Sequence, residues 1–252
     1  MPVIERGGLS FHVQLLGEGP PLAMLHGLLV GSMASWYFGA APRLARRHRV
    51  LLHDLRGHGL SSHAPRGYDL TTLGGDLEAL LPLAGDGPVT LVGHSWGALT
   101  ALRFALARPG RVRRLILIEA PLPPSHLPEL SAFLGRRPDQ MLEVLPDALR
   151  RDVTEGSRQG RRFVAQLRRL VEDSTLLADL SAEPDIPDET LAELNIPVLC
   201  IYGDRSGCRP AGERLARVLP RARLRILPGG HFLPAEAAVP LADLLDEELI
   251  HG

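Results

Sequence analysis

The segment Gly93-His94-Ser95-Trp96-Gly97 contains the residues whose types and spacing could do chemistry. Its two glycines let the backbone reverse sharply between an apolar strand expected at 88–93 and a helix expected at about 96–107. Such a turn pushes Ser95 into a strained, exposed position. The first N–H groups of the helix point toward the serine oxygen and favour a negative charge there. A Gly-x-Ser-x-Gly match also occurs by chance, but the strand before it and the helix after it predict a nucleophile.

A serine hydroxyl is a weak nucleophile near neutral pH, so it needs a base in contact with it. Of the ten histidines, only His231 and His251 follow the last expected strand, and His251 is next to the end of the sequence. His231 follows Gly229-Gly230, which lets the loop bend inward. We therefore predict His231 as the base; the alternative is an ordinary histidine of a surface loop.

The base in turn needs a carboxylate that holds it in the correct tautomer. Asp204 follows the strand expected at 197–202 and gives the chain order Ser, Asp, His, so we predict it as the acid. Glu119 ends the strand expected at 112–118 and could reach the same histidine. We expect Glu119 instead in the wall of the site or in a salt bridge, and Asp204 could also be a plain turn residue.

Acyl chemistry also needs two fixed N–H donors for the developing oxyanion. The N–H of Trp96, directly after the serine, is one candidate. The other is the N–H of Leu28, because His26-Gly27-Leu28 turns sharply after an apolar strand at 22–25.

Strand and helix patterns alternate regularly from 22 to 119, which predicts an α/β fold with a mostly parallel, doubly wound, eight-stranded sheet. An antiparallel hairpin is expected at residues 3–6 and 9–16. Further helices are expected at about 34–46, 71–84, 210–219 and 235–249, with strands at 50–53, 197–202 and 223–227. The alternation stops at 121–193, where several amphipathic helices are punctuated by prolines. We therefore expect a core domain formed by 1–120 and 194–252 and a helical cap at 121–193, inserted after the sixth strand, which covers the ligand end of the sheet.

Five motifs in this order resemble one known family. They are His26-Gly27, the run from Asp54 to Ser61, the serine turn, Gly203-Asp204 and Gly230-His231. Together they look like the α/β-hydrolase fold, in its capped branch of small esterases, lactonases, carbon–carbon bond hydrolases and cofactor-free haloperoxidases. The resemblance covers about residues 3 to 249 and is weakest in the insertion. In the epoxide hydrolase and haloalkane dehalogenase branch the nucleophile is Asp, so Ser95 argues against both activities.

The resemblance and the candidate site together imply a serine hydrolase that cleaves a small to medium carboxylic ester, lactone or thioester through an acyl-enzyme. A carbon–carbon bond hydrolase or a biosynthetic thioesterase is the alternative within enzymes. A ligand receptor on the same fold is the alternative of a different class. We expect no cofactor and no metal; the histidines at 53, 58 and 63 fit no ligand pattern.

Composition limits the partners. The chain has 252 residues, 28 basic against 29 acidic side chains and a formal charge of −1, so nothing favours a nucleic acid or an anionic membrane. The N-terminal residues lack a signal-peptide pattern, so we expect a cytoplasmic protein with a small-molecule substrate; the oligomeric state stays open. Four residues are candidates for substrate binding, although core packing is an equal alternative for the aromatic ones: His26, Trp36, Glu119 and Phe232. Arginines from 158 to 169 form either a solvated helix face or an electrostatic funnel for anionic substrates.

Overall fold

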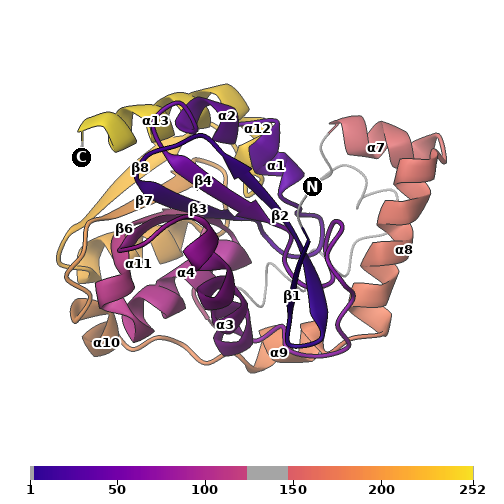
Figure 1. Cartoon of the computed structure of the whole chain (residues 1–252). Helices are drawn as coiled ribbons and strands as arrows, with labels where there is room; N and C mark the ends of the chain where they lie inside the picture. The colour runs from indigo at the N-terminus through magenta and orange to yellow at the C-terminus, as the bar shows by residue number, and fades with distance from the viewer. Residues whose placement is uncertain (1–2, 124–146, 252) are drawn as a thin grey trace.

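An eight-stranded sheet forms the centre of the molecule (Figure 1). The computed structural model describes residues 3–123 and 147–251. The strands run in the order β1-β2-β4-β3-β5-β6-β7-β8. Their bounds are β1 Val3–Arg6, β2 Leu9–Leu16, β3 Pro21–Leu25, β4 Arg49–His53, β5 Val89–His94, β6 Val112–Ile118, β7 Val198–Gly203 and β8 Ala222–Leu227. Strand β2 pairs antiparallel with β1 and β4, and all the other pairings are parallel, which confirms the predicted fold class.

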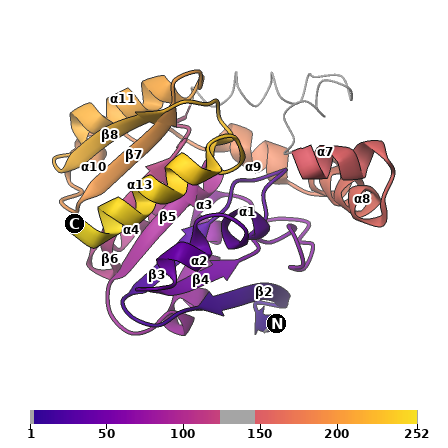
Figure 2. The same cartoon turned by 90° about the horizontal axis from the view of Figure 1, so that it is seen from above.

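The central strands, β3 to β7, are largely buried on both faces because helices cover each face of the sheet (Figure 2). The position of β3 between two buried clusters explains why its sequence is apolar without interruption. Leu22 and Met24 belong to one buried cluster, whereas Ala23 and Leu25 belong to the other. The first cluster includes side chains of α1 (Ala34–Tyr37), α2 (Ala41–Leu44) and α13 (Ala238–His251). The second includes side chains of α3 (Leu70–Leu80), α4 (Trp96–Ala107) and α11 (Arg209–Val218).

Two predicted helices are broken by proline. The helix expected at 34–46 is split into α1 and α2, and Pro42 lies in the first turn of α2. The helix expected at 235–249 is split into α12 (Leu233–Glu236) and α13, with Pro240 in the first turn of α13. A proline has no N–H to donate to the preceding turn, so it is tolerated in a first turn but not inside a continuous helix.

The other local predictions agree more closely with the structure. Helix α3 begins after Asp69, whose side chain accepts a hydrogen bond of 2.8 Å from the N–H of Thr72, as expected of a cap. A 3₁₀ turn, Leu81–Leu83, follows it. Another, Pro109–Arg111, precedes β6.

Between β6 and β7, the described residues form helices and no strand. These helices are α7 (Asp147–Thr154), α8 (Arg158–Glu172), α9 (Leu176–Ala182) and α10 (Asp188–Ala192). Leucines 170, 176 and 180 are buried in the same cluster as α3 and α4, and the N–H of Thr175 donates to the carbonyl of Pro65 at 3.0 Å. Part of the predicted cap, residues 124–146, lies outside the described residues. The division into core and cap stays a prediction.

No helix among residues 3–123 and 147–251 combines the length and the apolar composition needed to cross a bilayer.

Four histidines lie buried at or near the carboxyl ends of β3, β4 and β5: His26, His53, His58 and His94. Burial lowers the pKa of His26 and His53 to about 4 and that of His58 and His94 to about 3. Neither ring nitrogen of His53 has a hydrogen-bond partner. The folded protein therefore keeps these rings neutral, and it keeps the ring of His53 at the cost of two unpaired polar atoms.

We predict that stability falls as the pH drops from about 6.5 toward about 4. The pKa values in the folded state lie below the ordinary value of 6.5, so the unfolded chain binds protons at a higher pH than the folded protein does. This proton binding stabilises the unfolded state, and the free energy of unfolding therefore decreases as the pH falls. Each such histidine contributes up to about 1.4 kcal/mol per pH unit to this slope. Urea unfolding of His53→Leu at several pH values should show a smaller slope. At pH 7.5 its free energy of unfolding should be equal to or up to about 2 kcal/mol above that of the wild type, because no hydrogen bond is lost.

The partly exposed His63 supplies the matched control. His63→Leu should leave the slope as it is. An unchanged slope in His53→Leu would contradict the assignment.

Candidate active site

Five predicted site residues follow strands that end at the same edge of the sheet. The parallel register pairs Leu25 with Gly93, Ile118 with Ile201, and Gly203 with Leu227. The ends of β3, β5, β6, β7 and β8 are therefore neighbours, and the loops that follow them lie together. Those loops carry His26, Ser95, Glu119, Asp204 and His231.

Ser95 lies in the sharp turn between β5 and α4. Its φ is 54° and its ψ is −124°, a conformation that is rare for a residue with a side chain. The turn is tight on both sides. A Cβ on Gly93 would lie 2.5 Å from the Cα of Ala98, and one on Gly97 would overlap the carbonyl oxygen of His26. Only glycine fits at both positions, so the predicted strained turn is present.

Backbone strain in the described residues is concentrated around this turn. Apart from glycines, only Leu29, Ser95 and Glu119 have a positive φ in residues 3–123 and 147–251, at 67°, 54° and 54°. All three lie just beyond the ends of β3, β5 and β6. Strain of this kind persists where surrounding contacts impose it and is typical of functional sites.

His231 reaches the serine. Its Nε2 lies 2.9 Å from the Oγ of Ser95. The main-chain oxygen of His231 accepts a 2.8 Å hydrogen bond from the Nε2 of His94, and the two rings lie 5.3 Å apart. The side chain of His231 is 23% exposed, so its ring lies at the border between solvent and the core.

Glu119 lies on the other side of the His231 ring. The Oε2 of Glu119 is 3.3 Å from the Nδ1 of His231, and the carboxylate is fully buried. The N–H of Gly203 donates to Oε1 at 2.5 Å, and the hydroxyl of Ser206 donates to Oε2. The main-chain N–H of Glu119 donates a 2.9 Å hydrogen bond to the carbonyl oxygen of Ile201 in β7. This carboxylate is thus held by the end of β7 and by the loop that follows it.

The geometry contradicts the prediction that Asp204 orients the base. Its side chain is 48% exposed and makes an ion pair of 3.5 Å with Arg205. Its Oδ1 accepts a 2.9 Å hydrogen bond from the N–H of Gly229, in the loop that leads to His231. Asp204 therefore ties down that loop but makes no hydrogen bond with the His231 ring. Both acids follow a strand, and the sequence pattern alone does not tell which carboxylate turns inward.

The loop after β3 is held by two neutral histidines. The Nε2 of His58 accepts a 3.0 Å hydrogen bond from the N–H of Leu29, and the Nε2 of His26 accepts one of 3.0 Å from the N–H of Leu55. A Cβ on Gly27 would lie 3.1 Å from the Cβ of Ser95, so this loop packs directly against the serine turn. The role of the next N–H, that of Leu28, as an oxyanion donor stays a prediction.

A sequence profile described as the alpha/beta hydrolase fold matches residues 20–161, more than half of the chain. The chain belongs to the alpha/beta hydrolase fold family. The matched region contains the serine turn, Glu119 and the loop after β3, while β7, β8 and His231 follow it.

Relatives of this alpha/beta hydrolase differ in their chemistry. A pimeloyl-[acyl-carrier protein] methyl ester esterase of Nitrosomonas europaea is 31% identical, over 87% of this chain and 91% of that protein. The non-heme chloroperoxidase CPO-A1 of Kitasatospora aureofaciens is 26% identical, over 91% of each. Among solved structures, a thioesterase domain from the curacin biosynthetic pathway is 27% identical, with a TM-score of 0.70 over 97% of this chain and 98% of that one.

Three of the four residues predicted to bind substrate are buried. Trp36 is 1% exposed and lies in the buried cluster with α2 and α13, so it is a core residue of this alpha/beta hydrolase. His26 is also buried, and its Nδ1 donates to the carbonyl of Gly27 at 2.8 Å, so both of its ring nitrogens serve the loops. Glu119 is the partner of His231 and is not exposed to a substrate. Phe232 is partly exposed, with its ring edge-on to His231 at 5.4 Å, and its substrate-binding role stays a prediction.

Sequence reasoning did not single out two residues of the site, Ser206 and Cys208. Ser206 is bonded to the carboxylate of Glu119, and the Sγ of Cys208 lies 3.5 Å from the Nδ1 of His231. Both follow β7 within a few residues, in the stretch Gly203-Asp204-Arg205-Ser206-Gly207-Cys208. The sequence signal that could have indicated Ser206 and Cys208 was their position, a few residues after a strand whose carboxyl end carries other predicted site residues.

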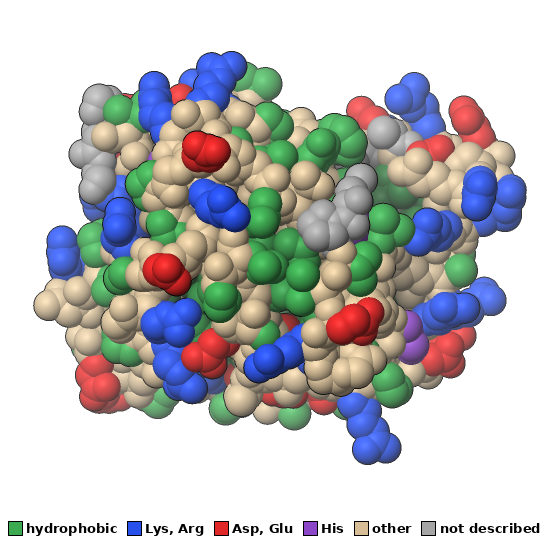
Figure 3. Space-filling model, in the orientation of Figure 1, with side chains coloured by type: hydrophobic (Ala, Val, Ile, Leu, Met, Phe, Trp, Pro, Cys, Tyr) green, Lys and Arg blue, Asp and Glu red, His purple; other side chains and the backbone are tan. Residues whose placement is uncertain are grey.

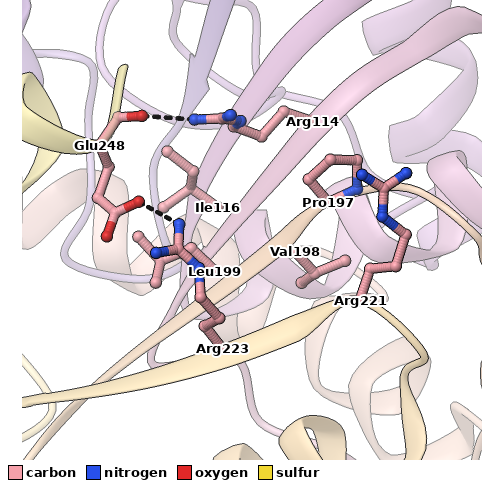
Figure 4. Close-up of a pocket in the computed structure, with 8 residues that line it drawn as sticks. All are labelled: Arg114, Ile116, Pro197, Val198, Leu199, Arg221, Arg223 and Glu248. Carbon is pink, nitrogen blue, oxygen red and sulfur yellow. Dashed lines mark hydrogen bonds and ion pairs between the residues drawn. The ribbon is translucent and has the colours of Figure 1, made fainter. Parts of the chain in front are cut away.

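A hollow in this alpha/beta hydrolase lies at the edge of the sheet opposite to the candidate active site. Figure 4 shows it at the starts of β6, β7 and β8, lined by Arg114, Val198 and Arg223 among others. Arg114 and Arg223 are both bonded to Glu248. Because the serine follows the carboxyl end of β5, this hollow belongs to the opposite edge of the sheet.

We predict opposite effects on stability for two glycine substitutions. Gly97→Ala should lower the free energy of unfolding by about 3 kcal/mol or more, because the new methyl group overlaps the main chain of β3 and its loop. Gly75→Ala, in the exposed part of α3 with nothing within 4 Å of the new Cβ, should raise it by about 0.5–1 kcal/mol. Urea unfolding measures both. Equal effects of the two substitutions would contradict the close packing of the turn.

Proposed function

We propose that this protein is a serine hydrolase that cleaves a small to medium carboxylic ester, lactone or thioester through an acyl-enzyme. One observation carries the proposal: the ring of His231 lies between the hydroxyl of Ser95, at 2.9 Å, and the buried carboxylate of Glu119, at 3.3 Å. A nucleophile, a base and an acid in contact are the arrangement that activates a serine.

Ser95 attacks the carbonyl carbon of the substrate while the Nε2 of His231 takes the proton from its hydroxyl. The Nδ1–H of His231 donates to Glu119, which fixes the tautomer and stabilises the charged ring. The N–H groups of Leu28 and Trp96 hold the developing oxyanion. His231 returns the proton to the leaving group, and water then cleaves the acyl-enzyme by the same steps in reverse.

The substrate class rests on the relatives and on the insertion. The names of the relatives include a methyl ester esterase and a thioesterase domain, so an acyl group on a carrier is a second candidate substrate. Basic side chains project from the arm formed by α7 and α8 (Figure 3), and Arg161 and Arg162 of α8 are exposed. We propose that residues 121–193 form a cap in which these arginines make a solvated helix face, with an electrostatic funnel for anionic substrates as the alternative. No step of the mechanism uses a cofactor.

We predict that a fluorophosphonate probe labels the wild type at Ser95 and that p-nitrophenyl esters are turned over. Ser95→Ala should not be labelled, and its kcat should fall by about 10⁴-fold or more, because the acyl-enzyme cannot form. Mass spectrometry of the labelled peptide identifies the modified residue. Acyl chains of graded length, lactones and thioesters then rank the substrate classes.

A wild type that neither labels nor turns over any of these substrates would instead favour a ligand receptor. Labelling at a serine other than Ser95 would also sink the proposal.

We predict that Glu119→Gln lowers kcat by about 10³–10⁴-fold, whereas Asp204→Asn lowers it by less than about fivefold. The amide of Gln presents an NH₂ group to His231 and cannot accept from its Nδ1–H, so the ring is held in the wrong tautomer. Asn at 204 keeps an oxygen for the N–H of Gly229, so the loop stays in place. Steady-state kinetics with a p-nitrophenyl ester measures both.

The reverse ranking, with Asp204→Asn the more damaging substitution, would restore Asp204 as the acid. Circular dichroism and urea unfolding of both variants separate a loss of catalysis from a loss of structure.

A further inference from the structure

Three potential metal ligands of different chemistry meet at the buried side of His231. They are the Oε2 of Glu119, the Sγ of Cys208 and the Nδ1 of His231, and all three atoms lie within 4.8 Å of one another. Carboxylate oxygen, thiolate sulfur and imidazole nitrogen are the three side-chain donors that zinc binds in proteins.

Two of the three separations between these atoms match a tetrahedral ion. Ligand atoms bound to zinc at about 2.0–2.3 Å lie roughly 3.3 Å apart for a nitrogen–oxygen pair and roughly 3.6 Å apart for a nitrogen–sulfur pair. In the structure the Nδ1 of His231 is 3.3 Å from the Oε2 of Glu119 and 3.5 Å from the Sγ of Cys208. The third pair, Oε2 and Sγ, lies within 4.8 Å, so a movement of about 1 Å or less would bring all three atoms onto one ion.

The carboxylate is already prepared for this role. Gly203 and Ser206 donate to Glu119 and fix its position, as hydrogen bonds commonly do for carboxylates that bind a metal. A hard cation such as Mg²⁺ prefers a set of oxygen ligands, whereas the sulfur and nitrogen here favour zinc and similar ions.

We propose that Glu119, Cys208 and His231 form an inhibitory zinc site. The binding itself follows from these three side chains, whereas its effect on activity rests on the proposed function. Cys208 loses its thiol proton to solvent. The ring of His231 gives up the proton on Nδ1 and takes one on Nε2, so the ring stays neutral and each Zn²⁺ bound releases one proton overall. A ring with its Nδ1 on zinc and a proton on Nε2 donates to the hydroxyl of Ser95 and cannot act as its base.

Metal binding is tested in Ser95→Ala, which keeps all three ligands. Titration with Co²⁺ should give a thiolate-to-cobalt absorption band in the near ultraviolet at one ion per chain. Zn²⁺ should abolish the band and raise the unfolding temperature. The band should be missing in Ser95→Ala/Cys208→Ala and Ser95→Ala/Cys208→Ser and present in Ser95→Ala/Cys200→Ala. Cys200 is the matched control because it is also buried and lies inside β7.

Inhibition is tested with the active enzyme and a p-nitrophenyl ester. Zn²⁺ should inhibit the wild type and Cys200→Ala, and EDTA should restore the activity. Cys208→Ala, compared with its own rate without metal, should need at least about tenfold more Zn²⁺ for half inhibition. Circular dichroism establishes that each variant is folded, and Cys208→Ser, closer in volume, replaces the alanine variant if that one does not fold.

The experiments distinguish a failure of the zinc site from a failure of the proposed function. A Co²⁺ band that is missing in Ser95→Ala, or that persists without Cys208, overturns the zinc site whatever the activity. Equal inhibition of the wild type and Cys208→Ala overturns its inhibitory role. A protein that binds Co²⁺ through Cys208 but turns over no ester keeps the metal site and refutes the proposed function.

Discussion

The buried carboxylate of Glu119 is the interaction on which the arrangement at the ligand edge depends. It receives hydrogen bonds from Gly203 at the end of β7 and from Ser206 in the next loop, and it faces the ring of His231 after β8. One side chain at the end of β6 thus joins the loops of two further strands. Burying a charged carboxylate without such partners would cost several kcal/mol of stability. The fully buried side chain of Glu119 therefore depends on the hydrogen bonds that it receives.

The same arrangement explains why strain accumulates at this edge. Ser95 and Glu119 directly follow their strands and Leu29 lies four residues after β3; the positive φ of each turns the chain abruptly. The cost of such conformations, about 1–3 kcal/mol each, is offset by the packed sheet beneath them and by the hydrogen bonds that each loop makes. Ser95, Glu119 and His231 come into contact because β5, β6 and β8 all end in sharp turns or loops at one edge of the sheet.

Neutral histidines give this edge much of its framework. His26 and His58 accept hydrogen bonds from the main chain of two loops, and His94 donates to the main chain of the loop that carries His231. An imidazole can donate with one nitrogen and accept with the other, but only while it is neutral. Burial keeps it neutral, so the framework and the acid sensitivity predicted for the fold have the same physical origin. Cys208 adds a different feature, because its thiol beside the Nδ1 of His231 completes a group of three potential metal ligands with Glu119.

The sequence by itself determined the fold class, the order of strands and helices, the strained turn at Ser95 and the placement of His231 after the last strand. These follow from periodicity and from glycine positions, which are local properties of the chain. It predicted Asp204 as the acid and Glu119 in the wall of the site or in a salt bridge, although both residues lie at strand ends. Only the tertiary structure placed the carboxylate of Glu119 at His231 and that of Asp204 on the loop before it. The reason is that the direction of a side chain beyond a strand depends on the backbone turn there and on the neighbouring strands, and these are fixed by the sheet and not by the local sequence. The same physical reason applies to Trp36, whose side chain lies in the core, and to Cys208, whose Sγ lies beside the ring of His231.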